Sequence, residues 1–229
     1  MQKLSNNTYR IFRWIIKTPP PSKYSSKIQD FYGKQGVPVP NCVLRAKRLA
    51  VYNLIPGVPL EEIECQDDRR SLSIELIRLL RTIHSSALQV QISDDSGSSP
   101  YFVRDILPPT IVSHCDITPD NVIVNKGHVN GIIDWEMAGP THPYTELAKV
   151  CWRFSRGFNY RKEIIEDYCK EYGVPSVDFT QIWQTIITLI EREISFICSQ
   201  GDYPKALKWR KEELVWFEKN KPSSIKGEV

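Results

Sequence analysis

Three residues with side-chain oxygen atoms are spaced so that a short hairpin would bring them together. Asp116, Asn121 and Asp134 surround two apolar runs, Val122–Val124 and Val129–Ile133, which flank a turn-like stretch with a glycine. This pattern is typical of a β-hairpin, whose first and last residues lie side by side. We expect the three side chains to converge at its open end. Carboxylate and amide oxygens in such a group suit a hard divalent cation and a hydroxyl that must lose a proton.

The segment before this hairpin is predicted to begin with strands. Residues 8–17 combine aromatic and β-branched side chains and favour one strand, which three consecutive prolines end. A short helix is expected over 25–32. Residues 42–55 then indicate two strands with a polar turn near 45–48.

From residue 60 onward the periodicity becomes helical. Apolar residues in 71–85 recur at helical spacing, and 91–100 form a polar loop. Further helices are predicted after the hairpin, over 144–154, 161–172, 179–200 and 205–218. The layout is a small β-rich segment followed by a mostly helical lobe, and a cleft between them is the natural ligand site.

Composition excludes several classes of function. The chain has 229 residues with 41% hydrophobic and 25% charged residues, as in ordinary soluble proteins. A net charge of +3 without a dense basic run argues against nucleic acid. The six cysteines lack metal-binding spacing, and we expect reduced thiols in a cytoplasmic protein. No signal peptide and no membrane span are predicted.

The pattern His114-x-Asp116-x4-Asn121, followed by the hairpin and Ile133-Asp134-Trp135-Glu136, resembles the catalytic core of the aminoglycoside phosphotransferase and choline kinase-like family. These proteins are small-molecule relatives of protein kinases, in which H-R-D-x-x-x-x-N precedes a magnesium-binding Asp. Four other stretches also resemble the family, and the likeness covers roughly residues 36–155. The stretches are 36–40, the possible hinge 52–57, 79–84 and 146–148.

The resemblance implies an α+β fold of the bilobal protein-kinase-like type. A reduced β-rich N-lobe would span residues 1–55, with the hinge near 52–57. A mostly helical C-lobe would span 56–229 and carry the catalytic loop and the hairpin. The implied cofactors are Mg²⁺ and ATP, and the implied partner is a small molecule with an acceptor hydroxyl. Nothing in the sequence identifies that acceptor or the oligomeric state.

The resemblance also implies roles for single residues. Asp116 would accept the proton of the attacking hydroxyl, and Asn121 and Asp134 would hold Mg²⁺ against the nucleotide phosphates. His114 would fix the backbone of the catalytic loop, and Trp135 would pack. The nucleotide side is expected to involve Lys17 at the phosphates and the hinge residues Tyr52, Asn53 and Leu54 at the adenine.

The N-terminal segment departs from the family pattern. Residues 1–32 contain no glycine for a phosphate-covering loop, and no glutamate precedes Glu61, so the usual Lys–Glu ion pair cannot form in its normal shape. About 35 residues before Gly36 are expected to be too few for a complete opening sheet. Three alternatives follow: an active phosphotransferase with a minimal lobe, a kinase-fold protein repurposed for binding or another reaction, or a shortened version of a longer enzyme.

Overall fold

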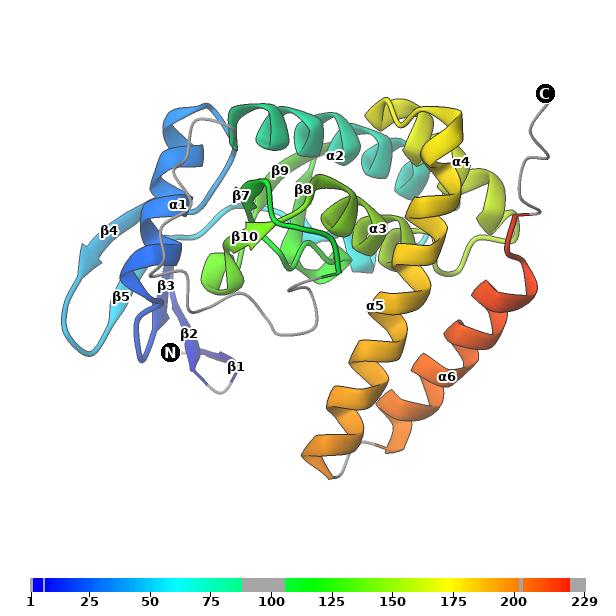
Figure 1. Ribbon diagram of the computed structural model, residues 1–229. Helices are drawn as coiled ribbons and strands as arrows, with labels where there is room; N and C mark the ends of the chain where they lie inside the picture. Colours follow the sequence, from blue (N-terminus) through cyan, green and yellow to red (C-terminus); the bar gives the residue numbers. More distant parts are fainter. Residues whose placement is uncertain (1, 6, 88–105, 202–203, 223–229) are drawn as a thin grey trace.

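The computed structural model of the chain describes residues 2–5, 7–87, 106–201 and 204–222. Figure 1 shows a sheet with one helix beside it at one end of the molecule, and a mainly helical region that extends away from it. The long helix α2 (Gln66–Ala87) runs across the top of this helical region, and α5 (Phe179–Gln200) and α6 (Pro204–Lys219) lie at its far side (Figure 1).

The N-terminal sheet has five antiparallel strands in the order β1-β2-β3-β5-β4. All five are four residues long: β1 (Gln2–Ser5), β2 (Thr8–Ile11), β3 (Trp14–Lys17), β4 (Cys42–Arg45) and β5 (Ala50–Asn53). The expectation that the opening segment is too short for a complete sheet is therefore wrong, because the sheet has five strands. The lobe is reduced because its strands and turns are short.

The single strand predicted over 8–17 is also wrong, because the segment is a hairpin of β2 and β3. The chain reverses at Phe12 and Arg13, and Phe12 has a φ of 52° with 90% of its surface exposed. A bulky aromatic residue rarely adopts a positive φ. The sequence thus offers no glycine, proline or asparagine to mark this turn.

Helix α1 (Lys23–Lys34) joins the sheet to the helical lobe and extends the helix predicted over 25–32. The Ser22 hydroxyl caps it by accepting a hydrogen bond from the Ser25 amide at 3.0 Å. At the other end of the helix, Tyr32 is fully buried and its hydroxyl donates to the carbonyl of Val112. The helix is therefore anchored to residues 111–113, which lead into the predicted catalytic loop at His114.

The remaining helices agree with the predicted ranges to within a few residues. Besides α2, α5 and α6 they are α3 (Pro143–Phe154) and α4 (Arg161–Tyr172), with short 3₁₀ turns η1 (Leu60–Glu62), η2 (Pro119–Asn121), η3 (Trp135–Met137) and η4 (Ser176–Asp178). Two short strands, β7 (Ile111–Ser113) and β10 (Gly139–Thr141), pair antiparallel. The predicted loop 91–100 lies outside the described residues.

The predicted hairpin is confirmed. Strands β8 (Val122–Asn125) and β9 (His128–Ile132) pair antiparallel, and β6 (Val58–Pro59) adds a third strand beside β8. The turn residues Lys126 and Gly127 have φ values of 51° and 78°, as a two-residue hairpin turn requires. At the open end the Ile133 amide donates to the Asn121 carbonyl at 2.9 Å. The hairpin thereby fixes the backbone on both sides of its polar end.

The helical lobe is built around α5, whose apolar face packs against α3 and α6. Trp183 is fully buried, and its indole N–H donates to the Phe217 carbonyl of α6 at 2.9 Å. In the described parts of the chain, no helix is both long and apolar enough to cross a membrane.

Candidate active site

A cleft of about 470 Å³ separates the sheet from the helical lobe. Lys17 and Tyr52 line it from the sheet. Asn121 precedes β8 and Asp134 and Trp135 follow β9, so these three residues line it from the open end of the β8–β9 hairpin. The structure therefore brings together most of the residues that the sequence singled out. Apolar side chains, among them Ile15, Leu54 and Ile123, also line it, as is usual for a pocket that binds a small molecule.

The loop over residues 114–121, which the resemblance predicts to be the catalytic loop, is held in place by His114, which is fully buried. Its Nδ1 accepts a hydrogen bond from the Asp116 amide at 3.2 Å, so Nε2 carries the proton and donates to the Ile133 carbonyl at 2.8 Å. Burial lowers the pKa of His114, although nearby carboxylates oppose this shift. Its ring also packs edge-on against Trp135, with centroids 4.7 Å apart. His114 thus fixes the loop to the hairpin as a neutral side chain.

Glu146 holds the same loop from the other side. Oε1 of this fully buried carboxylate of α3 accepts a hydrogen bond from the Cys115 amide at 2.6 Å. Oε2 accepts one from the Ser113 hydroxyl and lies 2.7 Å from Nε2 of His84 on α2. The Nδ1 of His84 in turn contacts the Tyr172 hydroxyl at 2.6 Å. His84 therefore does more than the helix packing that its sequence context indicates.

Asp116 is paired with Lys149, which is not among the site residues predicted from the sequence. Lys149 of α3 is 2% exposed, and its Nζ lies 2.6 Å from Oδ1 of Asp116. The same ammonium lies 3.4 Å from the Cys115 carbonyl. Lys149 follows Glu146 by three residues, so both lie on the same face of α3. That spacing is the only signal in the sequence that could have indicated the pair.

Asn121 and Asp134 offer oxygen atoms at the polar end of the hairpin. The Asn121 side-chain amide donates to the Asp116 carbonyl at 3.0 Å, which leaves its Oδ1 directed away from that bond. Asp134 has a left-handed φ of 67° and its side chain is 44% exposed in the cleft. One amide and one carboxylate oxygen suit Mg²⁺, which usually binds few protein ligands together with water and phosphate oxygens. The residues present fit the cation that the sequence implies.

Lys17 lies at the end of β3 and forms ion pairs with two carboxylates. Its Nζ is 2.5 Å from Oδ1 of Asp134 and 2.6 Å from Oε1 of Glu136. Burial would lower the pKa of Lys17, but the two carboxylates outweigh burial and raise it. Helix α1 contains no glutamate that could pair with Lys17. Lys17 pairs instead with Glu136, which follows the hairpin. On α1, the neutral Gln29 lines the cleft and donates to the Pro40 carbonyl at 2.5 Å.

The hinge residues also line the cleft, with their amides partly used inside the protein. The Asn53 amide donates to the Asn41 carbonyl at 3.0 Å, and the Leu54 amide donates to the Arg13 carbonyl at 2.8 Å. Within the described parts of the chain, the amide of Ile55 makes no hydrogen bond. A backbone donor for a ligand is therefore available within the predicted hinge 52–57, one residue after the last predicted adenine contact, Leu54.

A second pocket of about 440 Å³ opens on the other side of the catalytic loop. Asp116 lines this pocket, whereas Asn121 and Asp134 line the cleft, and Asp120 lines both. The loop therefore lies between the cleft and the second pocket, and Asp116 lines the second pocket. α3, α5 and α6 supply most of the rest of this second pocket.

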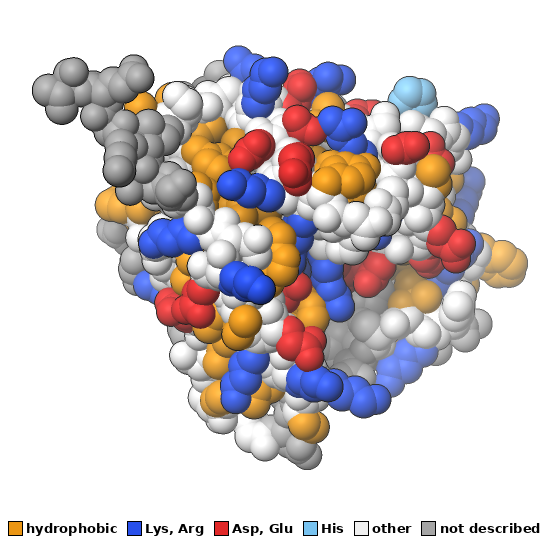
Figure 2. All heavy atoms as spheres, turned by 90° about the vertical axis from the view of Figure 1, so that its right-hand side faces the viewer, with side chains coloured by type: hydrophobic (Ala, Val, Ile, Leu, Met, Phe, Trp, Pro, Cys, Tyr) orange, Lys and Arg blue, Asp and Glu red, His pale blue; other side chains and the backbone are white. Residues whose placement is uncertain are grey.

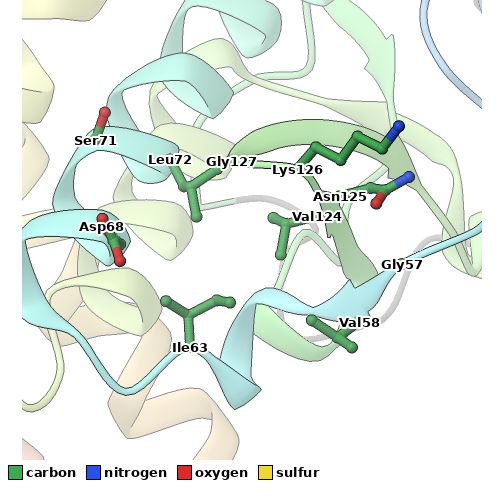
Figure 3. A pocket seen from close by; sticks show the side chains of 10 residues that line it. All are labelled: Gly57, Val58, Ile63, Asp68, Ser71, Leu72, Val124, Asn125, Lys126 and Gly127. Carbon is green, nitrogen blue, oxygen red and sulfur yellow. The ribbon is translucent and has the colours of Figure 1, made fainter.

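Another hollow, of about 370 Å³, lies outside the β8–β9 hairpin (Figure 3). Lys126 and Asn125 border it at the hairpin turn, and Asp68 and Leu72 border it on α2 (Figure 3). It contains none of the residues of the catalytic loop. The residues that the resemblance predicts for the chemistry line the cleft and the second pocket instead, and these two spaces share Asp120.

The arrangement of a small antiparallel sheet, a helical lobe and an intervening cleft with a catalytic loop defines the protein-kinase-like fold of small-molecule kinases. Solved structures of this class agree over nearly the whole chain. Choline kinase LicA from Streptococcus pneumoniae superposes with a TM-score of 0.61 at 15% identity, covering 94% of this chain and 92% of that one. Macrolide 2'-phosphotransferase MphH from Brachybacterium faecium gives 0.59 at 12% identity, with 97% and 91% covered. ADP-bound aminoglycoside phosphotransferase APH(2'')-Ib gives 0.57 at 13% identity, with 91% of each covered.

Sequence comparison points to the same family. Residues 103–180 match the model of the phosphotransferase enzyme family. The trifolitoxin immunity protein of Rhizobium leguminosarum bv. trifolii is 33% identical over 100 residues, which are 43% of this chain and 36% of that protein. The resemblance to the aminoglycoside phosphotransferase and choline kinase-like family is thus confirmed, and the family match together with the fold supports a phosphotransferase.

Proposed function

We propose that the protein transfers the γ-phosphoryl group of ATP to a hydroxyl of a small molecule. The observation that carries this proposal is the position of the catalytic loop between two pockets. Asn121 and Asp134 line the cleft on one side, and Asp116 lines the pocket on the other. A nucleotide in the cleft and an acceptor in the pocket would then meet at the loop.

In the proposed reaction the acceptor oxygen attacks the γ-phosphorus, the bond from this phosphorus to the β–γ bridging oxygen breaks, and ADP leaves with that electron pair. The proton of the hydroxyl passes to Asp116, through the carboxylate oxygen that Lys149 does not hold. Bound at Asn121 and Asp134, Mg²⁺ would neutralise phosphate charge. Lys17 would turn from its carboxylates toward the phosphates, and the Ile55 amide would donate to the adenine.

Two variants separate the steps of this proposal. Mg·ATP is expected to raise the melting temperature of the wild type, and Asp134→Ala should remove this shift because the carboxylate between Lys17 and the cation site is lost. Asp116→Ala should keep the shift but lower formation of phosphorylated product by at least about 10²-fold, the usual contribution of a general base. The measurements are thermal unfolding and ADP release with a panel of acceptors. Asp68→Ala, in the separate hollow, is the matched control.

A second candidate function is a kinase-fold binding module without phosphoryl transfer. It is favoured by the absence of glycine from residues 1–32 and by the neutral Gln29 on α1. The named role of the trifolitoxin immunity protein is also compatible with binding alone. This candidate predicts no melting shift with Mg·ATP. A shift that Asp134→Ala abolishes would exclude it, whereas no shift in the wild type would contradict the phosphotransferase.

A further inference from the structure

One face of α3 leads from the catalytic loop into the pocket on the acceptor side. Glu146, Lys149 and Arg153 follow each other at spacings of three and four residues, so they align along this face. Glu146 holds the Cys115 amide, Lys149 holds Asp116, and Arg153 lines the pocket about one helical turn farther on. A turn of α-helix rises by roughly 5.4 Å.

The ionic groups of this pocket are mostly paired with each other. Asp116 is paired with Lys149 at 2.6 Å, and Glu193 is paired with Arg210 at 2.9 Å. Arg153 forms no ion pair with any of the residues that the structure describes. The remaining carboxylate, Asp120, is exposed and lines both this pocket and the cleft. Among the described residues, Arg153 is therefore the cation of this pocket whose charge no ion pair offsets.

The guanidinium of Arg153 belongs to a cluster around the indole of Trp209 on α6. The guanidinium carbons of Arg153, Arg156 and Arg210 lie 5.0, 4.3 and 3.8 Å from the centre of this ring. Burial and the two neighbouring guanidiniums lower the pKa of Arg210, against the influence of Glu193. Contacts of this kind use the face of a guanidinium and leave its N–H edge free to donate.

We propose that the acceptor is a small hydroxy compound that carries a carboxylate or phosphate group, and that Arg153 binds this anion. Arg210 would support it from α6. The inference rests on the proposed function, because it concerns the acceptor of that reaction. With its hydroxyl at Asp116, such a compound would place its anion about one helical turn along α3, within roughly 6 Å. That separation fits a short hydroxy acid or a small polyol phosphate.

The preference for an anion is local to this pocket. Figure 2 views the molecule from the side of α4 and α6, where basic and acidic side chains are intermixed rather than gathered by sign. On this face, therefore, no field of a single sign is present that would select the acceptor. Charge-assisted hydrogen bonds from a partly buried guanidinium can do so, because they are strongest where water is excluded.

The test measures binding by thermal unfolding, with a non-hydrolysable ATP analogue and Mg²⁺ filling the cleft. The probes are glycerate and glycerol phosphate, compared with the neutral glycerol and with the cationic choline and kanamycin. We expect at least one anionic probe to raise the melting temperature, while glycerol at the same concentration does not. Arg153→Gln should weaken that probe's apparent binding by at least about tenfold, with partial recovery in Arg153→Lys.

Arg156→Gln is the matched control, because Arg156 contacts Trp209 without lining the pocket. It should leave the binding of the anionic probe unchanged. A melting shift from choline or kanamycin alone, no preference for the anionic probes over glycerol, or equal anion binding by Arg153→Gln would each overturn the inference. The shift caused by the nucleotide analogue alone is read first. If the nucleotide analogue alone causes no melting shift, the proposed function is contradicted rather than this inference. Binding of the anionic probes can then still be measured without nucleotide.

Discussion

The ion pair between Asp116 and Lys149 engages one of the two carboxylate oxygens, Oδ1. Asp116 is one-quarter exposed, whereas the lysine side chain is 3% exposed and also contacts the Cys115 carbonyl. The lysine is therefore the fixed partner, and it holds Oδ1 in place. Under the proposed function, the other carboxylate oxygen of Asp116 would serve as the base for a hydroxyl in the pocket that Asp116 lines. Lys149 acts as a positioning residue in this view.

Replacing Lys149 with methionine removes the cation but keeps an unbranched side chain of similar length. Under the proposed function, kcat should fall on the order of 10²-fold, because a misplaced base loses alignment with the hydroxyl. The KM for ATP and the melting shift caused by Mg·ATP should stay unchanged, since the cleft does not include this residue. Lys149→Arg should recover part of the rate. Lys170→Met, at an exposed position of α4, is the control. Equal losses in kcat and in nucleotide binding would contradict a positioning role.

Helix α3 organises the site as an element, because its Glu146 links the catalytic loop to α2 and α4. The link runs from the Cys115 amide through Glu146 to His84 and then to Tyr172. Burial alone would raise the pKa of Glu146. The hydrogen bond and charge of His84, with the Ser113 hydroxyl, outweigh burial and hold the pKa below its ordinary value. The carboxylate form of Glu146 is thus the form that stabilises the folded state.

This shift predicts how stability depends on pH. A carboxyl group with a lowered pKa in the folded state contributes stability that is complete above its ordinary value of about 4.5 and is lost as the pH falls through the folded value. Glu146→Gln should therefore cost about 2 kcal/mol at neutral pH, and the difference from wild type should shrink below about pH 4.5. Urea unfolding across this range measures it. A difference that is the same at neutral and acidic pH would contradict the assignment.

At the scale of the whole molecule, α6 is attached to the rest of the helical lobe by a buried ion pair. Arg161 at the start of α4 contacts both oxygens of Glu213 on α6, at 3.1 and 2.6 Å. The indole N–H of Trp152 on α3 donates to the same carboxylate at 2.8 Å. Three helices therefore meet at one side chain. α6 in turn carries Arg210 and Trp209 beside the acceptor pocket, so its attachment also supports that pocket.

Glu213→Ala should lower the free energy of unfolding by about 3–5 kcal/mol, because it leaves the buried Arg161 without a counter-charge. Its neighbour Glu212 provides the control, since its side chain is 63% exposed and its pair with Lys208 is 3.9 Å long. Glu212→Ala should cost no more than about 0.5 kcal/mol. Chemical denaturation of both variants gives the comparison. Similar costs for the two would show that the buried pair contributes little.

Features with a local signal were predictable from the sequence. The hairpin is marked by two apolar runs and a glycine turn, and the helices are marked by their periodicity. The turn at Phe12 has no such mark, which is why β2 and β3 were predicted as one strand. The pairing of Lys149 with Asp116 and of Glu136 with Lys17 depends on tertiary contacts. The domain boundary at residues 55 and 56 and the catalytic and metal roles stay predictions.

The position of β1 and β2 at the cleft has a consequence for the timing of the proposed reaction. Ser5 pairs with Thr8, and both residues line the cleft, so β1 and β2 form part of its lining. In kinases with a long mobile loop over the phosphates, release of product waits for that loop to open. Under the proposed function, two strands that are paired with each other would impose no such delay. Release of ADP would then not wait for a loop to open, and Lys17 would return to its ion pairs with Asp134 and Glu136 as the phosphates leave.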